Sequence, residues 1–150
     1  ELGMWGADDP DCRKPLLWGN IDHNPQVFAP DGSRSKAIAV FPNKERLSYQ
    51  KKLISLRRTR LEWTRGDAQF LHCNDKALTL AYLRKIGQRR SLIAFNFSNT
   101  PQTLLLNNQS VSSFKLLVAS RPEALLSGTI EARILRLKLA PLSGVALHLN

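Results

Sequence analysis

The pattern of apolar and polar positions divides the chain into three zones. Residues 1–42 show no regular alternation and are rich in Gly, Pro, Asn and Asp. Turn signals in this zone stand at Asp9-Pro10, Asn24-Pro25 and Pro30-Asp31-Gly32. A structureless stretch of this length is unusual within a compact domain, so we expect it to be either functional or disordered.

In the second zone, from Lys44 to Arg65, apolar residues recur with helical spacing. Asn43 stands where a helix N-cap is expected, and Gly66 stands where a C-cap is expected. The apolar stripe consists of Leu47, Leu53, Ile54, Leu56, Leu61 and Trp63. Such a stripe is typical of core packing rather than of a cofactor site. If nothing covers it, we expect the chain to associate with itself through the helix at residues 44–65.

The third zone, from Asp67 to Asn150, predicts short strands, because apolar residues alternate along it. The alternating sets are Leu78, Leu80 and Tyr82; Ile93, Phe95 and Phe97, which is one of two possible phases for that strand; Leu135, Leu137 and Leu139; and Val145, Leu147 and Leu149. About seven strands at this spacing indicate an antiparallel β-sandwich with a core made by these residues. His148 is out of phase with the last set and is expected to face water.

The charge is high and uneven. The 150 residues carry a net charge of +10, and the part from Lys44 onward contains eighteen bases and six acids. A non-catalytic basic β-sandwich that binds polysaccharide or nucleic acid is therefore an alternative function. Nucleic acid is not favoured, because no helix-turn-helix, zinc-finger or RNA-recognition signature accompanies the bases. The apolar runs are too short to cross a bilayer, so no membrane partner is expected. The sequence does not decide whether the protein lies in the cytoplasm or the periplasm.

No constellation of catalytic or metal-ligating residues stands out. The spacing of Cys12 and Cys73 does not demand a disulfide, and both are expected to be free. His72 lies beside Cys73, but neither belongs to a CxxC or HxxxH pair of the kind that binds zinc. We therefore expect no metal, no cofactor and no catalytic residue within this chain.

The segment from Glu1 to Trp18, ELGMWGADDPDCRKPLLW, suits the binding of a sugar, because carboxylates and guanidinium groups bind hydroxyls and indole rings stack on pyranoses. It resembles the loop after the last barrel strand of the alpha-amylase superfamily, glycoside hydrolase family 13. The Asp-Pro-Asp-Cys-Arg run points to the group of cyclomaltodextrinases, neopullulanases and maltogenic amylases. The positions in register with the family pattern are Glu1, Gly3, Met4, Gly6, Asp9, Pro10, Arg13, Pro15 and Trp18.

Two later segments extend the resemblance. Residues 91–99, SLIAFNFSN, and residues 139–149, LAPLSGVALHL, are similar to strands of the C-terminal sandwich of alpha-amylases. The resemblance implies a mainly β C-terminal fragment. Residues 1–66 would be the last loop and last helix of a (β/α)8 barrel whose strands are missing, and residues 67–150 an all-β C-terminal sandwich domain.

The resemblance also implies a function. The parent would be a retaining glycosidase of alpha-1,4-glucans such as maltodextrin, cyclodextrin, pullulan or starch. This fragment lacks the family's motifs for nucleophile and acid/base, so it is expected to be inactive alone. The same resemblance gives Asp9 and Arg13 contact with a glucose away from the cleaved bond; the alternative is that the two pair with each other. Trp5 either stacks on sugar or covers the barrel rim. The sandwich itself is best read as structural.

Overall fold

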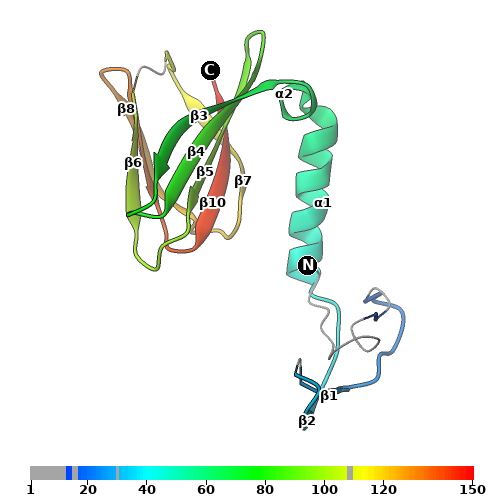
Figure 1. Cartoon of the computed structure of the whole chain (residues 1–150). Coiled ribbons are helices and arrows are strands. Elements are labelled where there is room, and N and C mark those ends of the chain that lie inside the picture. Colours follow the sequence, from blue (N-terminus) through cyan, green and yellow to red (C-terminus); the bar gives the residue numbers. More distant parts are fainter. Residues whose placement is uncertain (1–12, 15–16, 30, 108–109) are drawn as a thin grey trace. The chain divides into compact units, whose positions relative to one another are not determined.

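The computed structural model describes residues 13–14, 17–29, 31–107 and 110–150 (Figure 1). The chain forms two compact units, residues 1–51 and residues 52–150. Within the described ranges, no helix is both long enough and apolar enough to cross a membrane.

The first unit contains a β-hairpin in the zone where the sequence predicts no regular structure. Strand β1, Gln26–Phe28, pairs antiparallel with β2, Arg34–Ile38. The Ala29 amide donates to the Ser33 carbonyl at 2.8 Å, and Gly32 adopts the positive φ of 81° that a tight turn requires. The turn signal at Asp31-Gly32 is therefore confirmed, and the expectation of a structureless zone is wrong for this hairpin.

The predicted helix begins as expected but does not run unbroken. Helix α1 spans Lys44–Thr59, and the Asn43 side chain accepts a hydrogen bond from the Arg46 amide at 2.9 Å, as an N-cap does. Arg60 is extended (φ −105°, ψ 108°), and a separate short helix, α2, spans Leu61–Thr64. The prediction of one helix through residues 44–65 is wrong at Arg60, and Arg65 rather than Gly66 ends α2.

The second unit is built on an antiparallel β-sandwich, as predicted. A five-stranded sheet has the order β3-β4-β5-β10-β7 and a three-stranded sheet has the order β6-β9-β8 (Figure 1). The strands are β3 (Asp67–Asn74), β4 (Thr79–Ile86), β5 (Arg89–Asn96), β6 (Gln102–Leu106), β7 (Phe114–Ala119), β8 (Leu125–Glu131), β9 (Ile134–Leu139) and β10 (Ser143–Leu149).

The core confirms the predicted phase of two strands and reverses it in two others. The apolar sets of β9 and β10 are buried, as expected. In β4 and β5 the inward residues are instead Thr79, Ala81, Leu83, Leu92, Ala94 and Asn96. The larger residues predicted for the core lie on the outer face: Leu80, Tyr82, Ile93 and Phe95, with Phe97 beyond the end of β5. Both faces of β4 and β5 are apolar, so alternation alone cannot tell which one faces the core.

Candidate functional site

The residues predicted to contact substrate fall in the first unit. Asp9 and Trp5 lie outside the described residues. Arg13 is described, and it is exposed. The substrate-contact roles of these three residues stay predictions.

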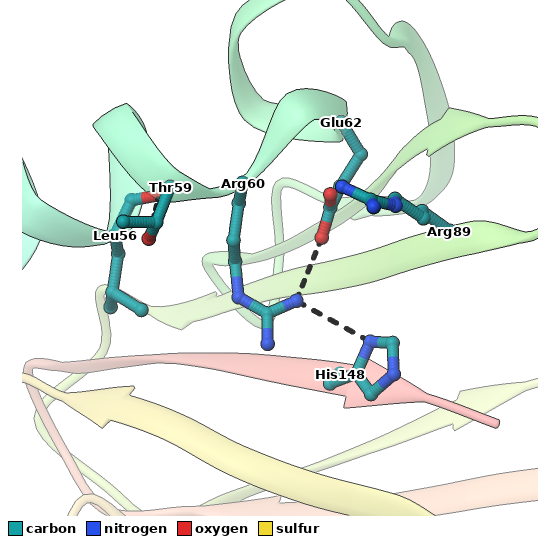
Figure 2. Close-up of a pocket in the computed structure, with 6 residues that line it drawn as sticks. All are labelled: Leu56, Thr59, Arg60, Glu62, Arg89 and His148. Atoms are coloured by element: carbon teal, nitrogen blue, oxygen red, sulfur yellow. Dashed lines mark hydrogen bonds and ion pairs between the residues drawn. The ribbon is translucent and has the colours of Figure 1, made fainter.

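A pocket of about 450 Å³ opens in the second unit, where the end of α1 and α2 meet the outer face of the five-stranded sheet (Figure 2). It is lined by Leu56, Thr59, Arg60, Glu62, Arg89 and His148. Helix and strand residues therefore meet here although they are far apart in the sequence.

Glu62 is the centre of this site. Its side chain is 1% exposed, and its Oε1 accepts hydrogen bonds from the Ser91 hydroxyl at 2.7 Å and from Arg60 Nη1 at 2.8 Å. A buried carboxylate is costly unless it is paired and hydrogen-bonded, and here both conditions are met. The extended backbone of Arg60 breaks the helix two residues before Glu62, and its guanidinium pairs with that carboxylate.

The same contacts decide the ionisation of Glu62. Burial opposes the charged form, but hydrogen bonds from Ser91 and Arg60, together with the Arg60 charge, outweigh it and hold the pKa of Glu62 below its ordinary value of 4.5. Glu62 is thus a carboxylate at neutral pH. This excludes a role for it as a proton-donating acid there.

Arg84 on β4 completes the attachment of α2. Its Nε donates to the Glu62 carbonyl at 3.1 Å and its Nη2 donates to the Trp63 carbonyl at 3.4 Å. Carbonyls at the end of a helix have no partner within the helix, so Arg84 satisfies acceptors that would otherwise be lost on burial. Arg84 lies directly opposite Ser91 in the register of β4 and β5. Two neighbouring strands therefore hold α2 from adjacent positions.

Gly66 permits this close approach. A Cβ at this position would lie 2.5 Å from the Glu62 carbonyl oxygen and 2.8 Å from that of Lys85. Both contacts are with backbone, which cannot rotate away as a side chain can. The glycine is needed for packing rather than for the helix-capping role predicted from the sequence.

His148 lies on the outer face of β10 but is half-buried, because Arg60 lies against it (Figure 2). Its Nδ1 is 3.4 Å from Arg60 Nη1 and 3.1 Å from the Arg90 carbonyl oxygen. A single ring nitrogen cannot accept from Arg60 and donate to a carbonyl at once, so the two contacts belong to different tautomers. His148 is thus out of phase with the buried residues of β10, as expected, but Arg60 leaves it only partly exposed to water.

The described contacts of this pocket attach α2 to the sheet. A retaining glycosidase needs two carboxyl groups about 5–5.5 Å apart. The lining residues supply one carboxylate, and Arg60 and Ser91 already occupy it. Within the described ranges, no group of three or more His, Cys, Asp or Glu is placed to hold a metal ion. Sequence reasoning missed the Glu62 attachment, although a lone acid between Leu61 and Trp63 in a basic helix end was a signal.

Comparison with known proteins gives a consistent set of relatives. No family model matches the chain. It is 29% identical over 106 residues to Neopullulanase 2 of Thermoactinomyces vulgaris, which covers 71% of this chain and 15% of that protein. It is 33% identical over 99 residues to a cyclomaltodextrinase of Geobacillus thermopakistaniensis (strain MAS1), covering 66% of this chain and 14% of that protein. The chain thus spans only a small part of these relatives' length.

Solved structures share the fold. An alpha-amylase from H. orenii matches 100% of this chain and 31% of its own, with a TM-score of 0.66 and 14% identity. A debranching enzyme from Nostoc punctiforme matches 71% of this chain and 20% of its own, with a TM-score of 0.54 and 27% identity. The resemblance and the mainly β fold predicted from the sequence are both confirmed.

Proposed function

Because the chain is a relative of the alpha-amylase superfamily, glycoside hydrolase family 13, and of its cyclomaltodextrinases and neopullulanases in particular, we propose that it forms the C-terminal part of a retaining glycoside hydrolase of alpha-1,4-linked glucans. The observation that carries this proposal is the match to these two relatives together with the sugar-binding motif at residues 1–18. Residues 1–66 then complete a catalytic barrel, and residues 67–150 form the domain beside it.

In this proposal Asp9 and Arg13 clamp the hydroxyls of a glucose away from the bond that is cleaved, and Trp5 stacks on a sugar ring. The clamp contributes binding energy and orientation rather than bond breaking. The exposed position of Arg13 is compatible with such a contact.

The sandwich acts as a structural module. The contacts of Glu62 with Ser91 and of Arg84 with the end of α2 support this role, because they fix a helix to the sheet through buried, charge-assisted hydrogen bonds. A module of this kind holds the end of the barrel in place and takes no part in the chemistry.

The first experiment separates the chain from its parent. The purified 150-residue chain is incubated with maltoheptaose, cyclodextrin and pullulan, and new reducing ends are measured. No turnover is expected, since the chain lacks the family's motifs for nucleophile and acid/base. Turnover that survives repurification would show that the chain carries a catalytic site of its own.

The second experiment tests membership in such an enzyme. The chain replaces the matching C-terminal portion of the Geobacillus cyclomaltodextrinase, and hydrolysis of cyclodextrin by this graft is measured. Activity is expected. In the active graft, Arg13→Ala should weaken long glucans more than the shortest one by about 1–3 kcal/mol in transition-state terms. Lys14→Ala, which removes the neighbouring charge, is the matched control, and an equal loss on all lengths would contradict the clamp.

A further inference from the structure

The pocket beside Glu62, of about 450 Å³, carries a surplus of basic groups (Figure 2). Its basic lining residues are Arg60, Arg89 and His148, and Glu62 is the one acid among its described lining residues. The Glu62 carboxylate is already bound by Arg60 at 2.8 Å and by the Ser91 hydroxyl at 2.7 Å. The charge of Arg89 is therefore left without a counter-charge among these residues.

His148 lies at the centre of the basic group. Arg60 Nη1 is 3.4 Å from its Nδ1. On one side of β10, Lys115 of β7 stands directly opposite His148; on the other side, Ser91 of β5 stands opposite it, with Arg89 two positions earlier on β5. Directly opposed residues of antiparallel strands share a face of the sheet, as do residues two positions apart. Three cationic side chains therefore lie around one imidazole on the outer face.

These cations are open to a ligand. Arg89 and Lys115 are exposed, and neither side chain makes an ion pair or hydrogen bond within the described part of the chain. Arg60 is 23% exposed and contacts Glu62 and His148 through Nη1 alone, which leaves its Nε and Nη2 without a described partner. Nε and Nη2 form one edge of a guanidinium, and such an edge donates two parallel hydrogen bonds to an oxyanion.

A phosphate group suits this arrangement better than a neutral sugar or a nucleic acid. Like charges held close together repel, and a dianion among them relieves that repulsion, whereas a hydroxyl does not. Single-stranded nucleic acid is bound by aromatic side chains along a groove, and none of the described lining residues is aromatic. The volume is in the range of small-molecule sites, and Leu56 supplies an apolar wall for a carbon skeleton.

We propose that this pocket binds a phosphate group, either as inorganic phosphate or as part of a phosphorylated sugar. Arg89 and Lys115 supply the charge, and the free edge of Arg60 donates from the wall of the pocket. Because Ser91 holds Glu62 and Glu62 holds Arg60, the attachment of α2 also builds the binding site. The site does not depend on the glycosidase activity proposed above for the parent.

Calorimetric titration of the 150-residue chain with inorganic phosphate tests the site. The pH is fixed and sodium chloride keeps the ionic strength constant, so that general screening does not change. Saturable binding is expected. Arg89→Gln should raise the Kd about fivefold or more, because it removes a charged hydrogen-bond donor, and Lys115→Gln should raise it as well. Arg136→Gln is the matched control: it removes the same charge from an exposed position on β9 of the other sheet and should change the Kd less than about twofold.

Glucose 6-phosphate and glucose identify what the pocket binds. Binding of glucose 6-phosphate that is tighter than that of phosphate supports a site for a phosphorylated sugar, and equal or weaker binding supports a site for phosphate itself. Glucose that binds as tightly as glucose 6-phosphate would overturn the proposal, as would the absence of saturable phosphate binding.

Two further results would also overturn it. Equal losses in Arg89→Gln and Arg136→Gln would indicate a general attraction of anions to a basic surface. A single-stranded oligonucleotide that displaces phosphate and binds more tightly would assign the basic groups to nucleic acid.

Discussion

The two faces of the five-stranded sheet are made by the same strands but differ in how far they are buried. On the inner face Ala81, Leu92 and Ala94 are completely buried, because the three-stranded sheet of this chain covers them. On the outer face α2 covers one end of the sheet, whereas Phe70 beyond it is mostly exposed. The inner face forms the hydrophobic core of the unit.

The covered end of the outer face is also chemically distinct from the inner face. It is held by a buried carboxylate and directional hydrogen bonds rather than by leucine packing. Such bonds add little net stability but are costly to break singly, so they favour one placement of α2 over others.

The largest effect is expected on the inner face. Leu92→Ala should lower the free energy of unfolding by about 2–5 kcal/mol, because it removes a fully buried side chain and leaves a cavity. Urea denaturation measures the loss. Leu116→Ala on the same sheet is the control, since Leu116 is 42% exposed and should cost much less. Equal losses would mean that the two positions do not differ in burial.

The next effect concerns the attachment of α2. Glu62→Ala should cost about 1–3 kcal/mol, because it leaves the buried Ser91 hydroxyl without its acceptor, while Arg60 keeps partial access to water. Glu123→Ala is the control: it removes a carboxylate from an exposed ion pair with Arg121 and should stay within about 0.5 kcal/mol. Chemical denaturation compares the two, and a larger loss for Glu123 would refute the anchoring role of Glu62.

A smaller effect should appear as pH dependence. The pKa of Glu62 is lower in the folded chain than its ordinary value of 4.5, so the unfolded chain binds the proton more readily. The stability from this ionisation is therefore fully present above pH 4.5 and is lost as the pH falls through the lower folded value.

Unfolding free energies of the parent chain and Glu62→Gln, measured over this acidic range, isolate the contribution. The parent should fall more steeply than the variant. Asp31, whose pKa is also lowered by its hydrogen bonds from Ser33, is present in both proteins and cancels in the difference. Parallel curves would show that Glu62 titrates alike in the folded and unfolded chain.

The smallest effect is expected at the turn that precedes β4. Leu78 is half exposed and has a φ of 51°, a conformation that a leucine adopts at a cost. Leu78→Gly should raise the stability of the isolated chain by about 0.5–1 kcal/mol, because glycine adopts this conformation without the clash. Thermal unfolding measures the gain. Leu105→Gly, made in β6, whose pairing with β9 is unbroken, should destabilise instead, and a loss at Leu78 of the same size would contradict the strain.

Several features could be predicted from the sequence because their causes are local. The Asn43 cap needs an amide three residues away, and the turn at Asp31-Gly32 needs a glycine with positive φ. The phases of β9 and β10 were readable because only one face of each is strongly apolar. The motif at residues 1–18 pointed to the relatives through the order of its side chains alone.

Other features depended on residues that are distant in the sequence. Both faces of β4 and β5 are apolar, so only the position of the second sheet decided that Ala81 and Leu92 face the core rather than Tyr82 and Phe95. The break at Arg60 and the burial of Glu62 required Ser91, which lies 29 residues further along the chain. Local spacing determines the secondary-structure elements and their periodicity. Tertiary contacts determine which face of the sheet is buried and which carboxylate is hydrogen-bonded.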